Sequence, residues 1–208
     1  MDVLAEYPEV MIISDEIYRH INFTDSYTSM ATFESVAHRT VIINGVSKAY
    51  AMTGWRIGFC AAPLEVAKAV TKLQGQYTSG PSSIAQKAAE EAYTGPQECV
   101  ERMCEAFRAR RDLIVGLAKE IPGIETNVPD GAFYLFPKVE AYLGKSYEGR
   151  VIATDSDLAM YLLEVGHVAS VAGSAFGMPG YIRLSYATSE DNIRTAMARI
   201  ASALAALK

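Results

Sequence analysis

Three places in this chain carry charged side chains in or beside apolar segments, and each of these side chains is of a type that does chemistry in proteins. The first is Asp15, in the segment SDEIY at residues 14–18, directly after an apolar run. In open α/β sheets, ligands bind beyond the carboxyl ends of the strands. The Asp15 carboxylate therefore either faces a cationic ligand group or makes an ordinary cap to the next loop. This motif alone leaves both alternatives open.

A lysine and an arginine stand eight residues apart in the segment NGVSKAYAMTGWRIG. Lys48 follows one apolar run, and Arg56 precedes the next. A lysine near a guanidinium and other dipoles can act as an amine nucleophile. The alternative is a surface loop with ordinary solvated charges. The apolar side chains of Ala49, Met52 and Trp55 argue against full exposure of such a loop to solvent.

The third candidate is Arg183, in the apolar segment YIRLSY at residues 181–186. An unpaired buried arginine is costly, because a charge loses its hydration on burial. Arg183 therefore either pairs with an acid of the fold or binds an anionic ligand. A planar guanidinium suits a carboxylate or a phosphate. This motif alone leaves the two alternatives open.

The elements that must position these side chains in the first half of the chain can be predicted from apolar runs and helix signals. Residues 10–14, 40–43 and 57–61 are short apolar runs, typical of strands buried on both faces. A helical stretch at residues 29–38 separates the first two runs, which predicts a parallel βαβ unit. The third run follows too closely for a crossover helix, so we expect it to be antiparallel or at an edge. Helices are expected at residues 64–73, directly after Pro63, and from Ser82 or Ser83 to about Tyr93.

The second half of the chain predicts one long helix followed by shorter elements. The helix runs from Pro96 to about Glu120, and its many charges indicate a solvated face. Turn and breaker residues then separate short strands and two further helices. We expect strands at residues 124–128, 132–136, 167–171 and 181–186, a helix at 155–164, and a last helix from Thr188 or Ser189 to the C-terminus.

The chain therefore predicts an α/β region with a buried parallel sheet over residues 1–100 and an α+β unit over residues 101–208. Two or three strands buried on both faces do not form a stable sheet alone, since the common sheet has about five strands. We expect either a further N-terminal segment or a partner to supply the rest.

Composition excludes several classes of function. The 208 residues carry 19 Lys and Arg against 24 Asp and Glu, a net charge of −5, which argues against nucleic acid as a main partner. The longest apolar runs are far shorter than the ~20 residues of a membrane span. No basic, signal-like region opens the sequence. Three cysteines without CxxC spacing and three scattered histidines argue against a disulfide scaffold or a metal site, and they fit a cytoplasmic protein.

Five segments, in this order, resemble the C-terminal half of class I/II (fold-type-I) pyridoxal-phosphate (PLP)-dependent aminotransferases, in the aspartate-aminotransferase-like branch. They span nearly the whole chain, and the lysine segment is the most specific. The resemblance implies an incomplete PLP-binding large domain over residues 1–100, with a truncated, mostly parallel sheet. It also implies a complete small domain over residues 101–208, entered through a long linking helix. The segments are SDEIY (14–18), NGVSKAYAMTGWRIGF (44–59), GAFYLFP (131–137), GSAFG (173–177) and YIRLSYATSE (181–190).

The resemblance implies a role for each candidate residue. Lys48 would hold PLP as an internal aldimine and then carry a proton between the substrate Cα and the cofactor. Asp15 would pair with the pyridinium nitrogen, and Tyr18 would donate a hydrogen bond to the 3-oxygen of the ring. Arg56 would bind the cofactor phosphate, and Arg183 would hold the substrate α-carboxylate.

The chain departs from the family's pattern in two side chains and in its extent. Gly45 stands where many relatives have a Ser or Thr that contacts the phosphate, so only its backbone N–H is left for that contact. Ala172 replaces a proline common before the Gly-Ser/Thr-x-Phe-Gly loop. The family's N-terminal half is not in this chain. That half brings the phosphate turn, the aromatic ring that stacks on the cofactor and the tyrosine lent by the neighbouring subunit.

The resemblance also implies an activity: transfer of an amino group between an L-amino acid and a 2-oxo acid. The full-length enzyme would be a homodimer, with no nucleic-acid or membrane partner. A PLP-dependent carbon–sulfur lyase of the same fold is one alternative, and a catalytically incompetent fragment is another. We expect this chain alone to bind PLP weakly and to turn over poorly. The choice of amino acid depends mainly on the absent half.

Overall fold

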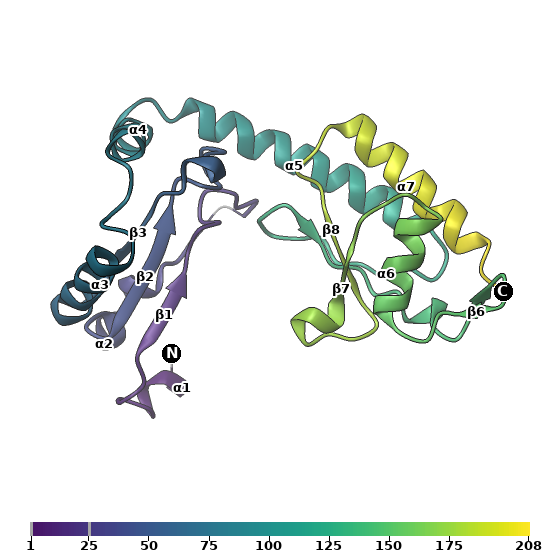
Figure 1. Ribbon diagram of the computed structural model, residues 1–208, viewed down its shortest axis with the longest axis horizontal. Coiled ribbons are helices and arrows are strands. Elements are labelled where there is room, and N and C mark those ends of the chain that lie inside the picture. Colours follow the sequence, from purple (N-terminus) through teal and green to yellow (C-terminus); the bar gives the residue numbers. More distant parts are fainter. Residues whose placement is uncertain (1, 25) are drawn as a thin grey trace. The chain divides into compact units, whose positions relative to one another are not determined.

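The chain folds into two units, Met1–Cys104 and Glu105–Lys208, in a computed structural model that describes residues 2–24 and 26–208 (Figure 1). The division between them lies within the long helix α5 (Glu98–Lys119). The boundary expected from the sequence, between residues 100 and 101, falls in the same helix. Each unit has its own sheet and its own buried apolar residues.

The first unit is built on a three-stranded sheet in the order β1–β2–β3. β1 (Ile12–Asp15) and β2 (Thr40–Gly45) are parallel, and β3 (Gly58–Ala61) runs antiparallel to β2. The predicted parallel pair and the antiparallel third strand are confirmed. The short connection between β2 and β3 explains this return, because a parallel strand would need a longer crossover.

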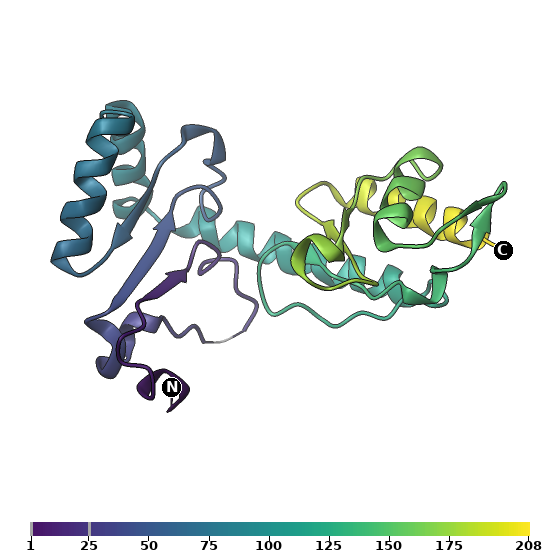
Figure 2. The same cartoon turned by 60° about the horizontal axis from the view of Figure 1, so that its bottom comes forward.

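Two helices of this unit begin at the local signals that predicted them. α3 (Leu64–Tyr77) starts directly after Pro63. α4 (Ser83–Thr94) is capped by Ser82, whose hydroxyl oxygen accepts the amide of Ala85 at 3.5 Å, as N-cap serines do. Figure 2 shows both helices on the β3 side of the sheet. They leave the carboxyl ends of β1 and β2 uncovered by helix.

The crossover between β1 and β2 is less helical than predicted. The stretch over residues 29–38 contains a 3-10 turn (Met30–Thr32) and the four-residue helix α2 (Glu34–Ala37), separated by Phe33 in an extended conformation. Helices this short are marginal on their own, so tertiary contacts decide their form. A further short helix, α1 (Asp2–Ala5), precedes β1.

The prediction that the strands are buried on both faces is wrong for β1 and also for β3, in which Phe59 is 49% exposed. Side chains alternate along a strand, and the described residues cover only one face of β1. Ile13 is 74% exposed. The register pairs Ile13 with Val41 and Asp15 with Ile43, so Ile13 and Ile43 share the uncovered face. An apolar face of the first unit is therefore open to solvent.

The second unit combines an antiparallel sheet, in the order β4–β8–β7, with a separate two-stranded hairpin, β5–β6. Its core includes Leu135, Leu158, Ile182 and Ile200, all with no exposed surface. This arrangement confirms the predicted α+β architecture. The elements after α5 are β4 (Tyr134–Leu135), β5 (Ser146–Tyr147), β6 (Arg150–Val151), α6 (Asp155–Glu164), β7 (Val171–Ala172), β8 (Ile182–Ser185) and α7 (Glu190–Ala205).

The helices α6 and α7 were predicted well because both have side-chain caps. Thr154 and Asp157 form a capping box at the start of α6, with the Thr154 hydroxyl accepting the Asp157 amide at 3.1 Å. The Thr154 hydroxyl and backbone N–H also donate to the Asp157 Oδ2, each at 2.9 Å, and these bonds lower the pKa of Asp157. Ser189 caps α7 in the same way by accepting the amide of Asn192.

The strands of the second unit were predicted too long. Residues 124–128 contribute only an isolated bridge, from Glu125 to Lys138. β4 is shorter than residues 132–136, and β7 begins later than residue 167. Left-handed backbone at Ala132 (φ 58°) and His167 (φ 53°) is incompatible with an extended strand, which explains both late starts.

Tyr186 should make the second unit sensitive to alkaline pH. Its side chain is fully buried, and its hydroxyl donates to the Ala132 carbonyl at 3.1 Å. Burial raises the pKa of Tyr186 from 10.0 to about 12. Because the folded pKa lies above the unfolded one, its contribution to stability is complete below pH ~10 and is lost as the pH rises towards ~12. We expect the melting temperature, followed by circular dichroism, to fall over this range.

The variant Tyr186→Phe should melt at a lower temperature at neutral pH, since it loses the hydrogen bond, but with a flatter pH dependence above pH ~10. Tyr77→Phe, at a tyrosine that is 84% exposed, is the matched control and should follow the wild type. An alkaline fall as steep in Tyr186→Phe as in the wild type would contradict this account.

Candidate active site

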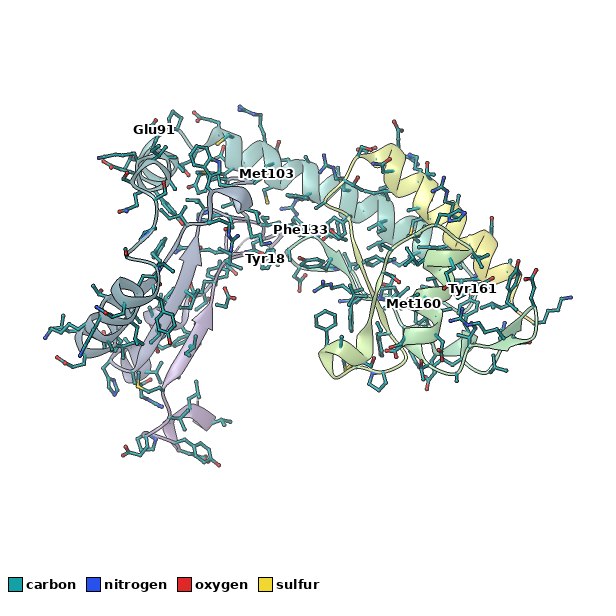
Figure 3. The ribbon with its side chains drawn as sticks, in the orientation of Figure 1. Tyr18, Glu91, Met103, Phe133, Met160 and Tyr161 are labelled. Atoms are coloured by element: carbon teal, nitrogen blue, oxygen red, sulfur yellow. The ribbon has the colours of Figure 1, made fainter. Side chains whose placement is uncertain are left out.

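The carboxyl ends of β1 and β2 place three of the sequence-predicted residues at one end of the first sheet. Asp15 ends β1, and Lys48 follows β2, whose carboxyl end lies beside that of β1 because the strands are parallel. The Lys48 Nζ lies 5.7 Å from the centre of the Tyr18 ring. Figure 3 shows Tyr18 just beyond the carboxyl end of β1. A carboxylate, a phenol and an amine are thus grouped where open α/β sheets bind ligands.

The Asp15 carboxylate makes the local cap that the sequence left as one alternative. Its Oδ1 accepts the backbone N–H of Ile17 at 3.2 Å, which holds the start of the following turn. The side chain is nevertheless exposed. A carboxylate has two oxygens and about four acceptor positions. The cap therefore leaves Asp15 able to accept from a cationic group of a ligand.

The loop that carries Lys48 is held by hydrogen bonds and aromatic packing. Ala49 is buried, and the Tyr50 hydroxyl donates to the Gln97 Oε1 at 2.8 Å. Burial raises the pKa of Tyr50, which keeps that donor protonated. The Tyr50 ring also packs edge-on against Tyr93, with ring centres 5.4 Å apart. The loop is not fully exposed, as its apolar residues led us to expect, although Trp55 is 47% exposed.

Arg56 ends the same loop in a strained conformation. Its backbone is left-handed, with φ 53° and ψ 49°, which is uncommon for a residue other than glycine and is concentrated at functional sites. The guanidinium is exposed, and its Nη1 donates to the Thr53 carbonyl at 2.9 Å. A guanidinium carries five N–H donors, so this bond leaves capacity for an anion. Arg56 lines a groove of about 600 Å³ together with Ile13, Ile43 and Phe59.

Gly45 is required where β2 and β3 approach each other. It pairs with Gly58, and a Cβ added at Gly45 would meet the Gly58 Cα at 2.8 Å and the Ile57 carbonyl oxygen at 3.0 Å. Both neighbours are backbone atoms, which move only with the strand. The close pairing of the two strands therefore favours glycine at this position in this chain.

The variant Gly45→Ser should destabilise the chain by about 1–3 kcal/mol, the usual cost of forcing extra atoms into a packed site. Thermal or urea unfolding followed by circular dichroism measures this effect. Gly54→Ala is the matched control in the same loop, because a Cβ at Gly54 has no heavy atom within 4 Å and its φ is not left-handed. Equal stability of Gly45→Ser and the wild type would show that β3 moves away freely.

Arg183, in β8 of the second unit, is held between two aromatic rings. Its guanidinium carbon lies 4.5 Å from the ring centres of both Tyr134 and Phe176. Aromatic faces attract guanidinium ions and fix the plane of the fork. Within residues 2–24 and 26–208, no carboxylate lies within ion-pair distance of Arg183. Arg183 is therefore not in an ion pair with a described carboxylate, which was one of the two alternatives from the sequence.

Two buried carboxylates near these residues were missed by the sequence reasoning. Glu16, next to Asp15, is 3% exposed and hydrogen-bonded to the Ser29 hydroxyl. Asp155, also 3% exposed, accepts the amide of Ser174 at 2.6 Å and so holds the loop that carries Phe176. Strand alternation could have found Glu16, because a residue next to an exposed Asp15 must face the opposite side. No comparable signal pointed to Asp155.

Among the residues that the structure describes, no cluster of three or more His, Cys, Asp or Glu side chains could hold a metal ion. None of the described helices is long and apolar enough to cross a membrane.

Comparison with known proteins assigns the chain to a family. The family described as aminotransferase class I and II matches residues 1–200, which is nearly the whole chain. The chain belongs to the class I and II aminotransferase family. Enzymes of this family are transferases, and they depend in general on PLP. The chain therefore has the α/β aminotransferase fold, with a truncated sheet in the first unit.

Individual aminotransferases match closely over about half of their own length. The chain is 46% identical over 206 residues to an aspartate aminotransferase of Rhizobium meliloti, covering 98% of this chain and 50% of that protein. An aspartate/prephenate aminotransferase of Nitrosomonas europaea is 45% identical, covering 97% of this chain and 52% of its own length. Among solved structures, that of the Rhizobium meliloti aspartate aminotransferase superposes with a TM-score of 0.95 at 45% identity, over 100% of this chain and 52% of that one.

A more distant aminotransferase structure carries a different substrate name. The aromatic aminotransferase of Pyrococcus horikoshii superposes with a TM-score of 0.87 at 34% identity, covering 98% of this chain and 54% of that one. The chain thus spans about half the length of the curated relatives that it matches.

Proposed function

We propose that this chain supplies the C-terminal half of a PLP-dependent aminotransferase, which moves an amino group between an L-amino acid and a 2-oxo acid. The observation that carries the proposal is the grouping of Lys48, Tyr18 and Asp15 at the carboxyl end of the β1–β2 pair, in a chain of this family. Each of these residue types has a partner on PLP, whose groups are an aldehyde, a ring nitrogen, a ring hydroxyl and a phosphate.

The donors present in the first unit fit that cofactor. Lys48 offers an amine for covalent attachment, and the Asp15 carboxylate suits a protonated ring nitrogen. Tyr18 offers a hydroxyl donor, and the Arg56 guanidinium matches a phosphate. The small residue Gly45 leaves only a backbone N–H at its position. When bound, PLP supplies an electron sink for the bonds at the substrate Cα.

The protein residues then bind, orient and move protons. Lys48 would hold PLP until the substrate amine displaces it, and its free amine would then carry a proton between the substrate Cα and the cofactor C4′. Asp15 would keep the proton on the ring nitrogen. Tyr18 would donate to the ring 3-oxygen, and Arg56 would fix the phosphate end. These assignments are proposals that rest on the family pattern and the local geometry of the first unit.

In the second unit, Arg183 would bind the α-carboxylate that every amino-acid substrate has, and so orient the Cα–H bond. The absence of a paired carboxylate among the described residues supports this role, as does the aromatic support on both sides of the guanidinium. The names of the relatives include aspartate, prephenate and aromatic substrates. All amino donors share the group that Arg183 would hold.

A chimera tests the proposal directly. It joins this chain to the half of the Rhizobium meliloti aspartate aminotransferase that the chain does not match. With PLP, an amino acid and a 2-oxo acid, we expect a new amino acid to form. Pyruvate and ammonia from cystathionine would instead indicate a carbon–sulfur lyase of the same fold. A folded chimera that binds PLP but does neither would indicate that this half is catalytically incompetent.

We also propose a homodimer and a cytoplasmic location for the full-length enzyme. The family pattern supports the first, and the open apolar face with Ile13 and Ile43 is compatible with further protein contacts. The three cysteines are free in the structure, as expected in a reducing compartment. Light scattering of the chimera measures its oligomeric state, and a monomer that retains full activity would contradict the proposed homodimer.

A further inference from the structure

Glu16 is a buried carboxylate that the proposed function does not use. It lies in the turn after β1, between Asp15 and Tyr18, and is only 3% exposed. Strand alternation continues into the turn: Ile13 and Asp15 are exposed, whereas Glu16 faces the opposite, covered side. The Asp15 carboxylate is therefore open to solvent, whereas the Glu16 carboxylate faces the interior of the first unit.

The Glu16 carboxylate receives several hydrogen bonds from the β1–β2 crossover. Its Oε1 accepts the Ser29 hydroxyl at 2.6 Å, the Met30 backbone N–H at 3.2 Å and the Ser14 hydroxyl at 3.3 Å. A buried carboxylate is tolerable only with such donors, because its hydration is lost. Glu16 therefore ties the turn after β1 to the residues around Ser29.

The backbone of the same residue is fixed as well. The Glu16 N–H donates to the Ile43 carbonyl at 2.8 Å, which extends the β1–β2 ladder by one bond. Its carbonyl accepts the Arg19 N–H at 2.9 Å, and the Tyr18 carbonyl accepts the Ile21 N–H at 2.8 Å. Glu16 is thus anchored through its side chain and through both of its backbone polar groups. Glu16 therefore fixes the segment in which Asp15 directly precedes it and Tyr18 follows two residues later.

We propose that Glu16 is a positioning residue that holds Asp15 and Tyr18 in place for PLP by anchoring the turn between them to Ser29 and Met30. The part of this inference that concerns PLP rests on the proposed function. The anchoring itself is a property of the first unit and can be measured without the cofactor.

Two variants of Glu16 distinguish the loss of the negative charge from the loss of the hydrogen-bond acceptor. Glu16→Gln keeps an acceptor oxygen at nearly the same place, whereas Glu16→Ala removes it and leaves the Ser29 hydroxyl and the Met30 N–H without that partner. Ser29→Ala removes the shortest of the bonds and leaves Glu16 in place. Glu34→Ala, at an exposed carboxylate of α2, is the control for the loss of one negative charge in the same unit.

Hydrogen–deuterium exchange of the cofactor-free chain is the first measurement. We expect the amides of residues 16–18 and of Met30 to exchange about tenfold faster or more in Glu16→Ala, since hydrogen bonds to charged groups are among the stronger ones. Glu16→Gln and Ser29→Ala should show a smaller increase, and Glu34→Ala none. Unchanged exchange in these segments of Glu16→Ala would overturn the anchoring.

Titration with PLP, followed by absorbance, is the second measurement and is made on the same proteins. We expect Glu16→Ala to bind PLP about tenfold more weakly and Glu16→Gln to recover most of the affinity. A Glu16→Ala protein with wild-type affinity would overturn the positioning role. If Glu16→Ala does not fold, Ser29→Ala and Glu16→Gln carry the same comparison. If the wild-type chain binds too little PLP to measure, the same variants are compared in the chimera. A chimera that binds no PLP would contradict the proposed function, while the exchange rates still decide whether Glu16 anchors the turn.

Discussion

Replacing Lys48 by alanine should abolish covalent attachment of PLP to this chain and lower transamination by the chimera at least about 10²–10⁴-fold. A positioned acid–base group usually contributes about 10²–10⁴-fold to the rate. The loss should be at least this large because Lys48 would also be the point of attachment of PLP. The Lys48 Nζ lies 5.7 Å from the centre of the Tyr18 ring at the end of the sheet, which places this amine beside the other groups proposed for the cofactor.

Borohydride reduction in the presence of PLP makes the attachment permanent, and peptide mapping then locates the modified lysine. We expect the label in the peptide that contains Lys48. Lys72→Ala, at an exposed lysine of α3, is the matched control and should keep both the label and the activity. A label that persists on another residue in Lys48→Ala, together with wild-type turnover, would assign the chemistry elsewhere.

Replacing Arg183 by alanine should lower kcat/KM of the chimera for an α-amino acid by about 30-fold or more. Removal of one partner of a desolvated charge pair costs about 2–5 kcal/mol, and each 1.36 kcal/mol corresponds to a factor of ten in rate. The guanidinium carbon of Arg183 lies 4.5 Å from the ring centres of both Tyr134 and Phe176, which would hold it in place for a bound carboxylate, and the 30-fold loss corresponds to the lower end of this range.

A substrate comparison distinguishes this role from a general loss of structure. An amine that lacks the α-carboxylate should react slowly with the wild type and equally slowly with Arg183→Ala, because the missing contact is the same. Arg183→Lys should recover only part of the activity, since an ammonium cannot make two parallel hydrogen bonds. Arg199→Ala, at an exposed arginine of α7, should behave as the wild type. An equal loss for both kinds of substrate would contradict the assignment.

Local signals predicted most of the helices and the order of the strands. Side-chain caps at Ser82, Thr154 and Ser189 explain why the starts of α4, α6 and α7 were found. Apolar runs located β1, β2 and β3, and the length of each connection gave their directions. These features depend on residues close together in sequence, which is where sequence patterns are informative.

The errors arose where backbone conformation or distant contacts decide. Left-handed backbone at Ala132 and His167 shortens two predicted strands, and neither residue type announces it. The exposure of Ile13 was missed because an apolar run does not say whether both faces of a strand are covered. Among the candidate site residues, local motifs suggested Asp15 and Lys48. Glu16 was missed because its donors, Ser29 and Met30, lie far along the chain.

The left-handed backbone of the lysine loop has a consequence for how this chain could be made more stable. Ala51 and Arg56 both have φ near 50°, where a side chain costs of order 1–3 kcal/mol and glycine is nearly free of that cost. A screen that rewards only heat resistance would accept glycine at either position. At Ala51 such a change is compatible with activity, whereas at Arg56 it removes the guanidinium proposed for the phosphate. Stability alone therefore decides the change at Ala51, for which no role in the site is proposed, whereas stability and function select in opposite directions at Arg56.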